Sequence, residues 1–194
     1  MKKILKCYPF KDVAVELIEG FEAYDGNIGD EPGKPHKGID YVLRKGDKFV
    51  GFEVFCMHDG EALQGVSKSW GNYVIVHSKA SRGKIVATVY AHLRIIHQAL
   101  PQMPEKGSKI KPKGLKIKAG TSLGKAGITG WTNRIVQLHL ELLEKDLKTG
   151  ITIKFDPYGL NARFSSGRYP QPNHTLQGLK HFWVSNNPPL ARLV

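Results

Sequence analysis

Short runs of strand-forming residues, each closed by a turn signal, follow one another through the middle of this sequence. Val, Ile, Tyr and Phe are frequent in the runs, and Gly, Asn, Asp and Ser separate them. No long helical period appears, so the pattern predicts an all-β class, a sandwich or partly open barrel of antiparallel strands. The expected strands are 39–43, 49–55, 62–66, 73–77, 85–91, 115–117, 122–126, 136–143 and 151–155.

The length and the distribution of turn residues suit one domain with appendages. The chain has 194 residues, which is a usual size for a single domain. We expect the domain to span 35–160, with an N-terminal extension at 1–34 packed on it and an irregular tail at 161–194 that is rich in Pro, Gly and Asn. A segment with three prolines, 94–113, is expected to be a long connection.

Three residues from two distant segments have the chemistry of a zinc site. His36 and Asp40 form a His-x-x-x-Asp pair where a strand begins, and His139 lies within an expected strand. Alternate strand residues share a face, so Gln137, His139 and Glu141 should project together, opposite a row of leucines. Two imidazoles and a carboxylate suit zinc, with a fourth position left for water. We therefore predict that His36, Asp40 and His139 bind one Zn²⁺.

His92 is the candidate for proton transfer beside this zinc site. It follows an expected strand within Tyr90-Ala91-His92-Leu93. An imidazole can carry a proton near neutral pH or donate a hydrogen bond to a reacting group. Taken alone, a histidine like His139 is more often a surface-strand residue, and one like His92 is more often a packed core residue. Their occurrence in order, each with its own strand, is what favours a catalytic centre.

The same motifs, in the same order, resemble those of lysostaphin/LytM-type zinc metallopeptidases. The likeness covers 35–160, and its specificity lies in the number of motifs rather than in any one of them. The matching segments are HKGID at 36–40, DG at 59–60, WGNYVIV at 70–76, YAHL at 90–93, AGTSLG at 119–124, Gly127, TG at 129–130, LHLE at 138–141 and DPY at 156–158.

The resemblance implies a duplicated-hybrid-motif β fold and a zinc endopeptidase that cleaves peptide cross-bridges of peptidoglycan. It implies His36, Asp40 and His139 as the metal ligands and His92 as one of two assisting histidines. The second assisting histidine should stand two residues before His139, where this sequence has Gln137. Glutamine can donate a hydrogen bond to a developing oxyanion, but it cannot transfer a proton near neutral pH.

The glutamine leaves three interpretations open. His92 alone can perform the proton transfer, another histidine such as His97 or His174 can replace the missing one, or the domain has lost activity and only binds the cell wall. The 95–118 segment is longer than the family usually has and adds positive charge. It is either a tolerated surface insertion or a determinant of substrate choice.

The net charge of the chain and its N-terminal sequence indicate which partners and which location to expect. A net charge of +12 suits anionic wall polymers as a further partner beside peptidoglycan peptides. Nucleic-acid binding ranks below these, because no recognition motif accompanies the charge. The N-terminus shows no evident signal peptide and no stretch reaches transmembrane length, so we expect delivery by a phage or by another export route. We expect a monomer, with Cys7 and Cys56 as free thiols or one disulfide.

Overall fold

The computed structural model describes residues 4–11, 14–19, 36–79, 83–97, 99–104, 113–155, 157 and 192–193. Strands, turns and loops make up these residues, and none of them is helical. Within this described part, no helix has the length and hydropathy to cross a membrane. The strands are β1 (Val15–Glu19), β2 (Ile39–Lys45), β3 (Lys48–Phe49), β4 (Glu53–Phe55), β5 (Gly60–Ser67), β6 (Gly71–Lys79), β7 (Lys84–Ala91), β8 (Leu93–Ile96), β9 (Leu115–Ile117), β10 (Ser122–Ala126), β11 (Leu138–Asp146), β12 (Thr152–Phe155) and β13 (Arg192–Leu193).

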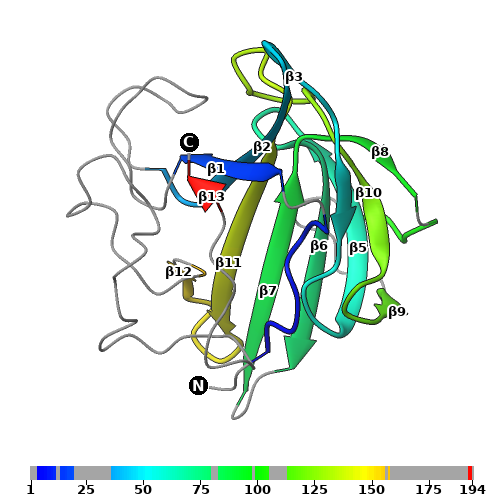
Figure 1. Ribbon diagram of the computed structural model, residues 1–194. Helices are drawn as coiled ribbons and strands as arrows, with labels where there is room; N and C mark the ends of the chain where they lie inside the picture. The colour runs from blue at the N-terminus through cyan, green and yellow to red at the C-terminus, as the bar shows by residue number, and fades with distance from the viewer. Residues whose placement is uncertain are drawn as a thin grey trace.

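The strands form a large sheet and a small one. The large sheet has the order β13-β1-β2-β11-β7-β6-β5-β9, with β12 also paired to β11 and β3 to β2. The small sheet has the order β4-β10-β8. Figure 1 shows β2, β11, β7, β6 and β5 running side by side, with β8 and β10 beside them. Every strand pair is antiparallel except β1 with β13.

Both sheets contribute to one hydrophobic core. Tyr41, Tyr90 and Leu140 of the large sheet and Val54 and Leu123 of the small sheet are fully buried in the same cluster. Apolar area removed from water is the main favourable term in folding, so this shared core holds the two sheets face to face. The all-β class predicted from the sequence is confirmed, and the sheets are open rather than closed into a barrel.

Two sequence predictions about strands are wrong. The run 49–55 is not one strand, because the chain leaves β3 and crosses to β4 of the small sheet between Phe49 and Glu53. The expected connection 94–113 begins within β8, which pairs with β10. Gly124 permits this pairing: its φ is +158°, and a Cβ there would lie 1.9 Å from the Ile95 carbonyl oxygen.

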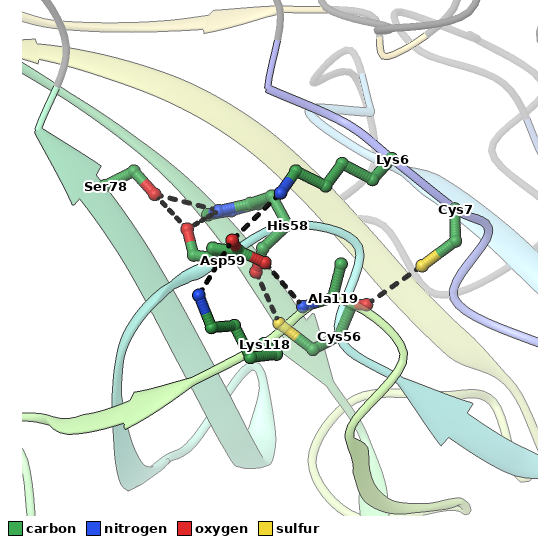
Figure 2. A network of polar contacts seen from close by, with 8 residues as sticks. All are labelled: Lys6, Cys7, Cys56, His58, Asp59, Ser78, Lys118 and Ala119. Carbon is green, nitrogen blue, oxygen red and sulfur yellow. Dashed lines mark hydrogen bonds and ion pairs between the residues drawn. The ribbon is translucent and has the colours of Figure 1, made fainter.

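Polar contacts fix the N-terminal segment to the sheets (Figure 2). Lys6 Nζ donates to Asp59 Oδ2 at 2.9 Å, and the Ala119 N–H donates to Asp59 Oδ1 at 3.0 Å. Cys7 and Cys56 are both free thiols, and Cys7 Sγ donates to the Cys56 carbonyl oxygen. Burial raises the pKa of the Cys56 thiol to about 12 and also raises that of Cys7. Both thiols are therefore protonated at neutral pH and are poor nucleophiles.

Of the expected appendages, the structure describes only parts. Residues 4–11 and β1 of the N-terminal 34 residues lie against the domain, with Ile4, Leu5 and Phe10 in its core. In the tail, β13 pairs with β1. His174, His181 and Trp183 lie outside the described residues, as does the lysine-containing stretch at 105–112.

Candidate metal centre

The register of neighbouring strands brings two of the predicted zinc ligands, Asp40 and His139, together. On the β2–β11 ladder Asp40 pairs directly with His139, and on the β11–β7 ladder His139 pairs with Ala91. Side chains of directly paired residues lie on the same face of a sheet, within contact distance. Backbone pairing therefore brings Asp40 beside His139 and puts His92, the residue after Ala91, at the end of the adjacent strand.

His36, Asp40 and His139 converge on one point. His36 Nε2 lies 2.9 Å from His139 Nδ1 and 3.5 Å from Asp40 Oδ1. His139 Nδ1 lies 2.8 Å from the same Asp40 oxygen. All three residues are buried, with exposed fractions of 1%, 2% and 8%. Among the described residues, this is the one group of His, Cys, Asp and Glu side chains with ligand atoms close enough to share a metal ion.

The donor set fits zinc. Tetrahedral zinc with ligand bonds of about 2.0–2.1 Å places its ligand atoms about 3.3–3.4 Å apart. The spacings here, 2.8, 2.9 and 3.5 Å, differ from that geometry by a few tenths of an ångström. Side-chain rotations can supply this difference. Three protein ligands also leave a coordination position open, as in catalytic rather than structural zinc sites.

The buried Asp40 carboxylate needs a positive charge beside it. Burial alone would raise the pKa of the Asp40 carboxyl, but His36 and His139 outweigh burial and bring that pKa below its ordinary range. Burial opposes a charged imidazole at His139, yet Asp40 raises the pKa of His139 to about 10. A buried carboxylate is stable only with a compensating charge. A proton on His139 or a metal ion can supply it.

Glu141 lies behind His139. Its Oε1 is 3.2 Å from His139 Nε2, on the side of the ring away from Asp40, and Lys154 Nζ of β12 donates to the same oxygen at 2.7 Å. Burial raises the pKa of Glu141, but His139 and then Lys154 outweigh it and lower that pKa. Strand alternation predicted that Glu141 shares a face with His139. Lys154 was not predicted, because pairing between β11 and β12 brings it in.

His92 is held by its backbone and its ring. Its φ is 63°, in the left-handed region that few residues other than glycine adopt, and its N–H donates to the Trp70 carbonyl oxygen at 2.8 Å. His92 Nδ1 donates to the Thr129 carbonyl oxygen at 2.7 Å, which leaves Nε2 as the second ring nitrogen. The His92 and His139 ring centroids are 5.7 Å apart. Burial, followed by His139, lowers the pKa of His92 to about 4.

Gln137 precedes β11 and is 1% exposed. Its N–H donates to the Gly127 carbonyl oxygen at 3.0 Å, while its side-chain Oε1 is buried and has no hydrogen-bond partner among the described residues. A buried amide oxygen without a partner costs about 1–3 kcal/mol. The Gln137 side chain therefore lowers the free energy of unfolding.

The other histidines have separate environments. His97 Nε2 pairs with Glu53 of the small sheet at 2.9 Å and not with the His36–Asp40–His139 group. His58 is buried, and its Nε2 lies 3.0 Å from Thr88 Oγ1. His77 is partly exposed beside Glu61. His174 lies outside the described residues, so its predicted role as a replacement proton donor stays a prediction.

Comparisons with known proteins relate the chain to peptidases through structure. The sequence matches no protein-family model and no curated protein. A crystal structure of a zinc-containing peptidase from Vibrio cholerae matches 79% of this chain with a TM-score of 0.50 and 22% identity. This chain spans only 39% of that peptidase. A mutant catalytic domain of a prophage-encoded M23 protein from Enterococcus faecalis matches 70% of this chain and 85% of its own length, at TM-score 0.47 and 20% identity.

The match to the Vibrio cholerae peptidase establishes a shared fold. This structural match is independent of the motif resemblance, which lies in short segments of sequence. The two agree with the convergence of His36, Asp40 and His139 on one point. The chain therefore shares an all-β fold with part of that zinc-containing peptidase, in agreement with its resemblance to the lysostaphin/LytM-type metallopeptidases.

Proposed function

We propose that the protein is a zinc-dependent endopeptidase that hydrolyses peptide cross-bridges of bacterial peptidoglycan. The observation that carries this proposal is the meeting of His36 Nε2, Asp40 Oδ1 and His139 Nδ1 within one buried group. Zinc held there would polarise a peptide carbonyl and acidify a water molecule, which is the chemistry that hydrolysis of an unactivated amide requires. The peptidoglycan substrate rests on the motif resemblance.

The residues around the ligands can supply the remaining steps. His92 Nδ1 is fixed on the Thr129 carbonyl oxygen, so Nε2 is the atom that can exchange a proton with the reacting groups. The low pKa of His92 keeps the imidazole neutral at pH 7, ready to accept a proton and pass it to the leaving amine. Gln137 would donate an N–H of its side-chain amide to the developing oxyanion. We also propose anionic wall polymers as partners of the basic surface.

The test is digestion of purified cell walls. The zinc-loaded protein is incubated with walls that carry different cross-bridges, and the release of free amino groups is measured. We expect release from at least one wall type, and no release after His139→Ala. Failure on every wall type by a protein that contains zinc would refute the proposed activity.

A non-catalytic wall-binding domain is the second candidate, and Gln137 is the observation that favours it. Such a domain would retain zinc and sediment with walls without cutting them. The substitution Gln137→His restores the histidine that the resemblance implies. Hydrolysis by the wild-type protein supports the endopeptidase, whereas hydrolysis only after Gln137→His supports the binding domain.

A further inference from the structure

A buried chain of polar contacts leads from the zinc ligand His139 to a lysine on another strand. Glu141 Oε1 lies 3.2 Å from His139 Nε2 and 2.7 Å from Lys154 Nζ. The Glu141 side chain is 2% exposed and that of Lys154 is 32% exposed. Lys154 pairs with Leu143 on the β11–β12 ladder, and Leu143 is two residues beyond Glu141. The strand register thus brings the ammonium group over the carboxylate.

The contact to Glu141 determines which nitrogen of His139 faces the other ligands. Glu141 Oε1 accepts a hydrogen bond from Lys154 Nζ and is therefore an acceptor for His139 as well, so His139 Nε2 carries the proton that faces it. In a neutral imidazole, Nδ1 then has the lone pair, and this atom is the one beside His36 and Asp40. The opposite tautomer would put a proton where a metal ion must bind. Glu141 therefore selects the ligating form of the ring.

Lys154 holds Glu141 in place, because its Nζ donates to Glu141 Oε1 at 2.7 Å. A buried carboxylate that lost this partner would turn toward water. Glu141 Oε2 has no hydrogen-bond partner among the described residues, so the carboxylate is held through Oε1 alone. Lys154 Nζ also lies 5.7 Å from the centre of the Trp70 ring, which restricts the lysine on its other side.

We propose that Glu141 and Lys154 are positioning residues that orient His139 for zinc, so that zinc affinity depends on Lys154, a residue outside the ligand set. This inference rests on the zinc site of the proposed function. It adds a dependence on β12 that the ligand motif does not contain.

The same strand provides a matched control. Lys84 Nζ lies 2.6 Å from Glu144 Oε1, and Glu144 is on β11, three residues beyond Glu141. This ion pair resembles the Lys154–Glu141 pair in chemistry and in its cross-strand setting. The Glu144 carboxylate pairs with Lys84 rather than with a histidine. Loss of the control pair should therefore affect folding stability and leave zinc affinity unchanged.

The experiment measures zinc affinity of the full chain by competition with a chromogenic chelator. We expect Glu141→Leu to weaken zinc binding about 10–100-fold, the usual effect of losing a group that orients a metal-bound histidine. Glu141→Gln keeps an acceptor oxygen and should lose less. Lys154→Met should weaken binding, Lys154→Arg should restore most of it, and Lys84→Met should have no effect.

A spectroscopic readout accompanies the affinity. Cobalt substituted for zinc should show altered visible absorption in Glu141→Gln and Lys154→Met, because the His139 ring is reoriented, and an unaltered band in Lys84→Met. The near-isosteric Glu141→Gln variant keeps the test valid if Glu141→Leu fails to fold. Affinities and spectra equal to those of Lys84→Met would overturn this inference alone. A wild-type protein that binds no zinc would overturn the proposed function.

Discussion

His139 Nδ1 lies 2.8 Å from Asp40 Oδ1, although 99 positions separate the two residues in the chain. The contact follows from backbone register, because His139 and Asp40 are direct partners on the β2–β11 ladder. Asp40 and His139 of the candidate metal centre therefore lie on central strands of the large sheet, and His36 lies three residues before β2. A site built on paired strands is held more precisely than one built on mobile segments.

The close packing at Gly38 gives a first prediction. A Cβ at Gly38 would lie 2.6 Å from His139 Cε1 and 2.6 Å from the Leu140 carbonyl oxygen. Gly38→Ala should displace the His139 ring and weaken zinc binding at least about tenfold, as expected when a ligand loses its orientation. Chelator competition measures this loss.

Gly51 supplies the control for that prediction. A Cβ at Gly51 would lie 2.8 Å from the Ala126 carbonyl oxygen, away from the metal centre. Gly51→Ala should therefore lower the free energy of unfolding, by about 1–3 kcal/mol for such overpacking, without changing zinc affinity. Equal zinc affinities in the two variants would show that Gly38 does not determine the position of the His139 ring.

Removal of the His92 imidazole should separate catalysis from metal binding. Asparagine tolerates left-handed backbone conformations better than most residues, so His92→Asn suits the φ of 63° at this position. Turnover should fall about 10²–10⁴-fold, the usual contribution of general acid–base help. Zinc content should stay at the wild-type level, and His77→Asn on β6 should be as active as wild type. Undiminished turnover in His92→Asn would exclude His92 as the proton carrier.

Gln137→Leu should lower turnover and raise the free energy of unfolding. The buried Oε1 of Gln137 lacks a partner, so replacing the amide by an apolar side chain of similar size should raise the free energy of unfolding by about 1 kcal/mol. Loss of the amide N–H should lower turnover about 10²–10³-fold if it stabilises the oxyanion. Denaturant unfolding and wall digestion measure the two effects. A variant that gains stability and keeps full turnover would assign Gln137 no catalytic role.

The buried His58 predicts acid destabilisation. Burial lowers its pKa in the folded protein, so the unfolded chain binds a proton at a pH where the folded protein does not. The neutral, buried His58 imidazole stabilises the fold fully above the ordinary histidine pKa of about 6.5. This stabilisation is lost as the pH falls below that value. His58→Gln should therefore lose less stability than wild type between pH 7 and pH 5, measured by denaturant unfolding. Parallel losses in the two proteins would contradict this.

Local sequence patterns predicted most strands because turn chemistry is local. The expected runs 115–117 and 122–126 agree with β9 and β10, and 85–91 differs from β7 by one residue. The sequence predicts the strand that carries His139 at 136–143, whereas β11 spans Leu138–Asp146. Pairing with β7 as far as Asp146 sets that boundary, and no local signal encodes it.

The predictable part of the site is the part that a motif contains. The sequence predicted that His36, Asp40 and His139 would meet, and the structure confirms that they do. Their role as zinc ligands remains a prediction. The sequence does not predict the contact of Thr129 with His92 or that of Lys154 with Glu141. Each contact depends on pairing between distant segments.

The most direct test of the central claim is metal analysis of the purified protein and of His36→Ala, Asp40→Ala and His139→Ala. The account predicts one equivalent of zinc in the wild-type protein and a large loss of zinc in each variant. Asp146→Ala, at the end of β11, should retain zinc, because the Asp146 carboxylate accepts from the N–H groups of Lys148 and Thr149. Wild-type zinc content in all three ligand variants would contradict the account.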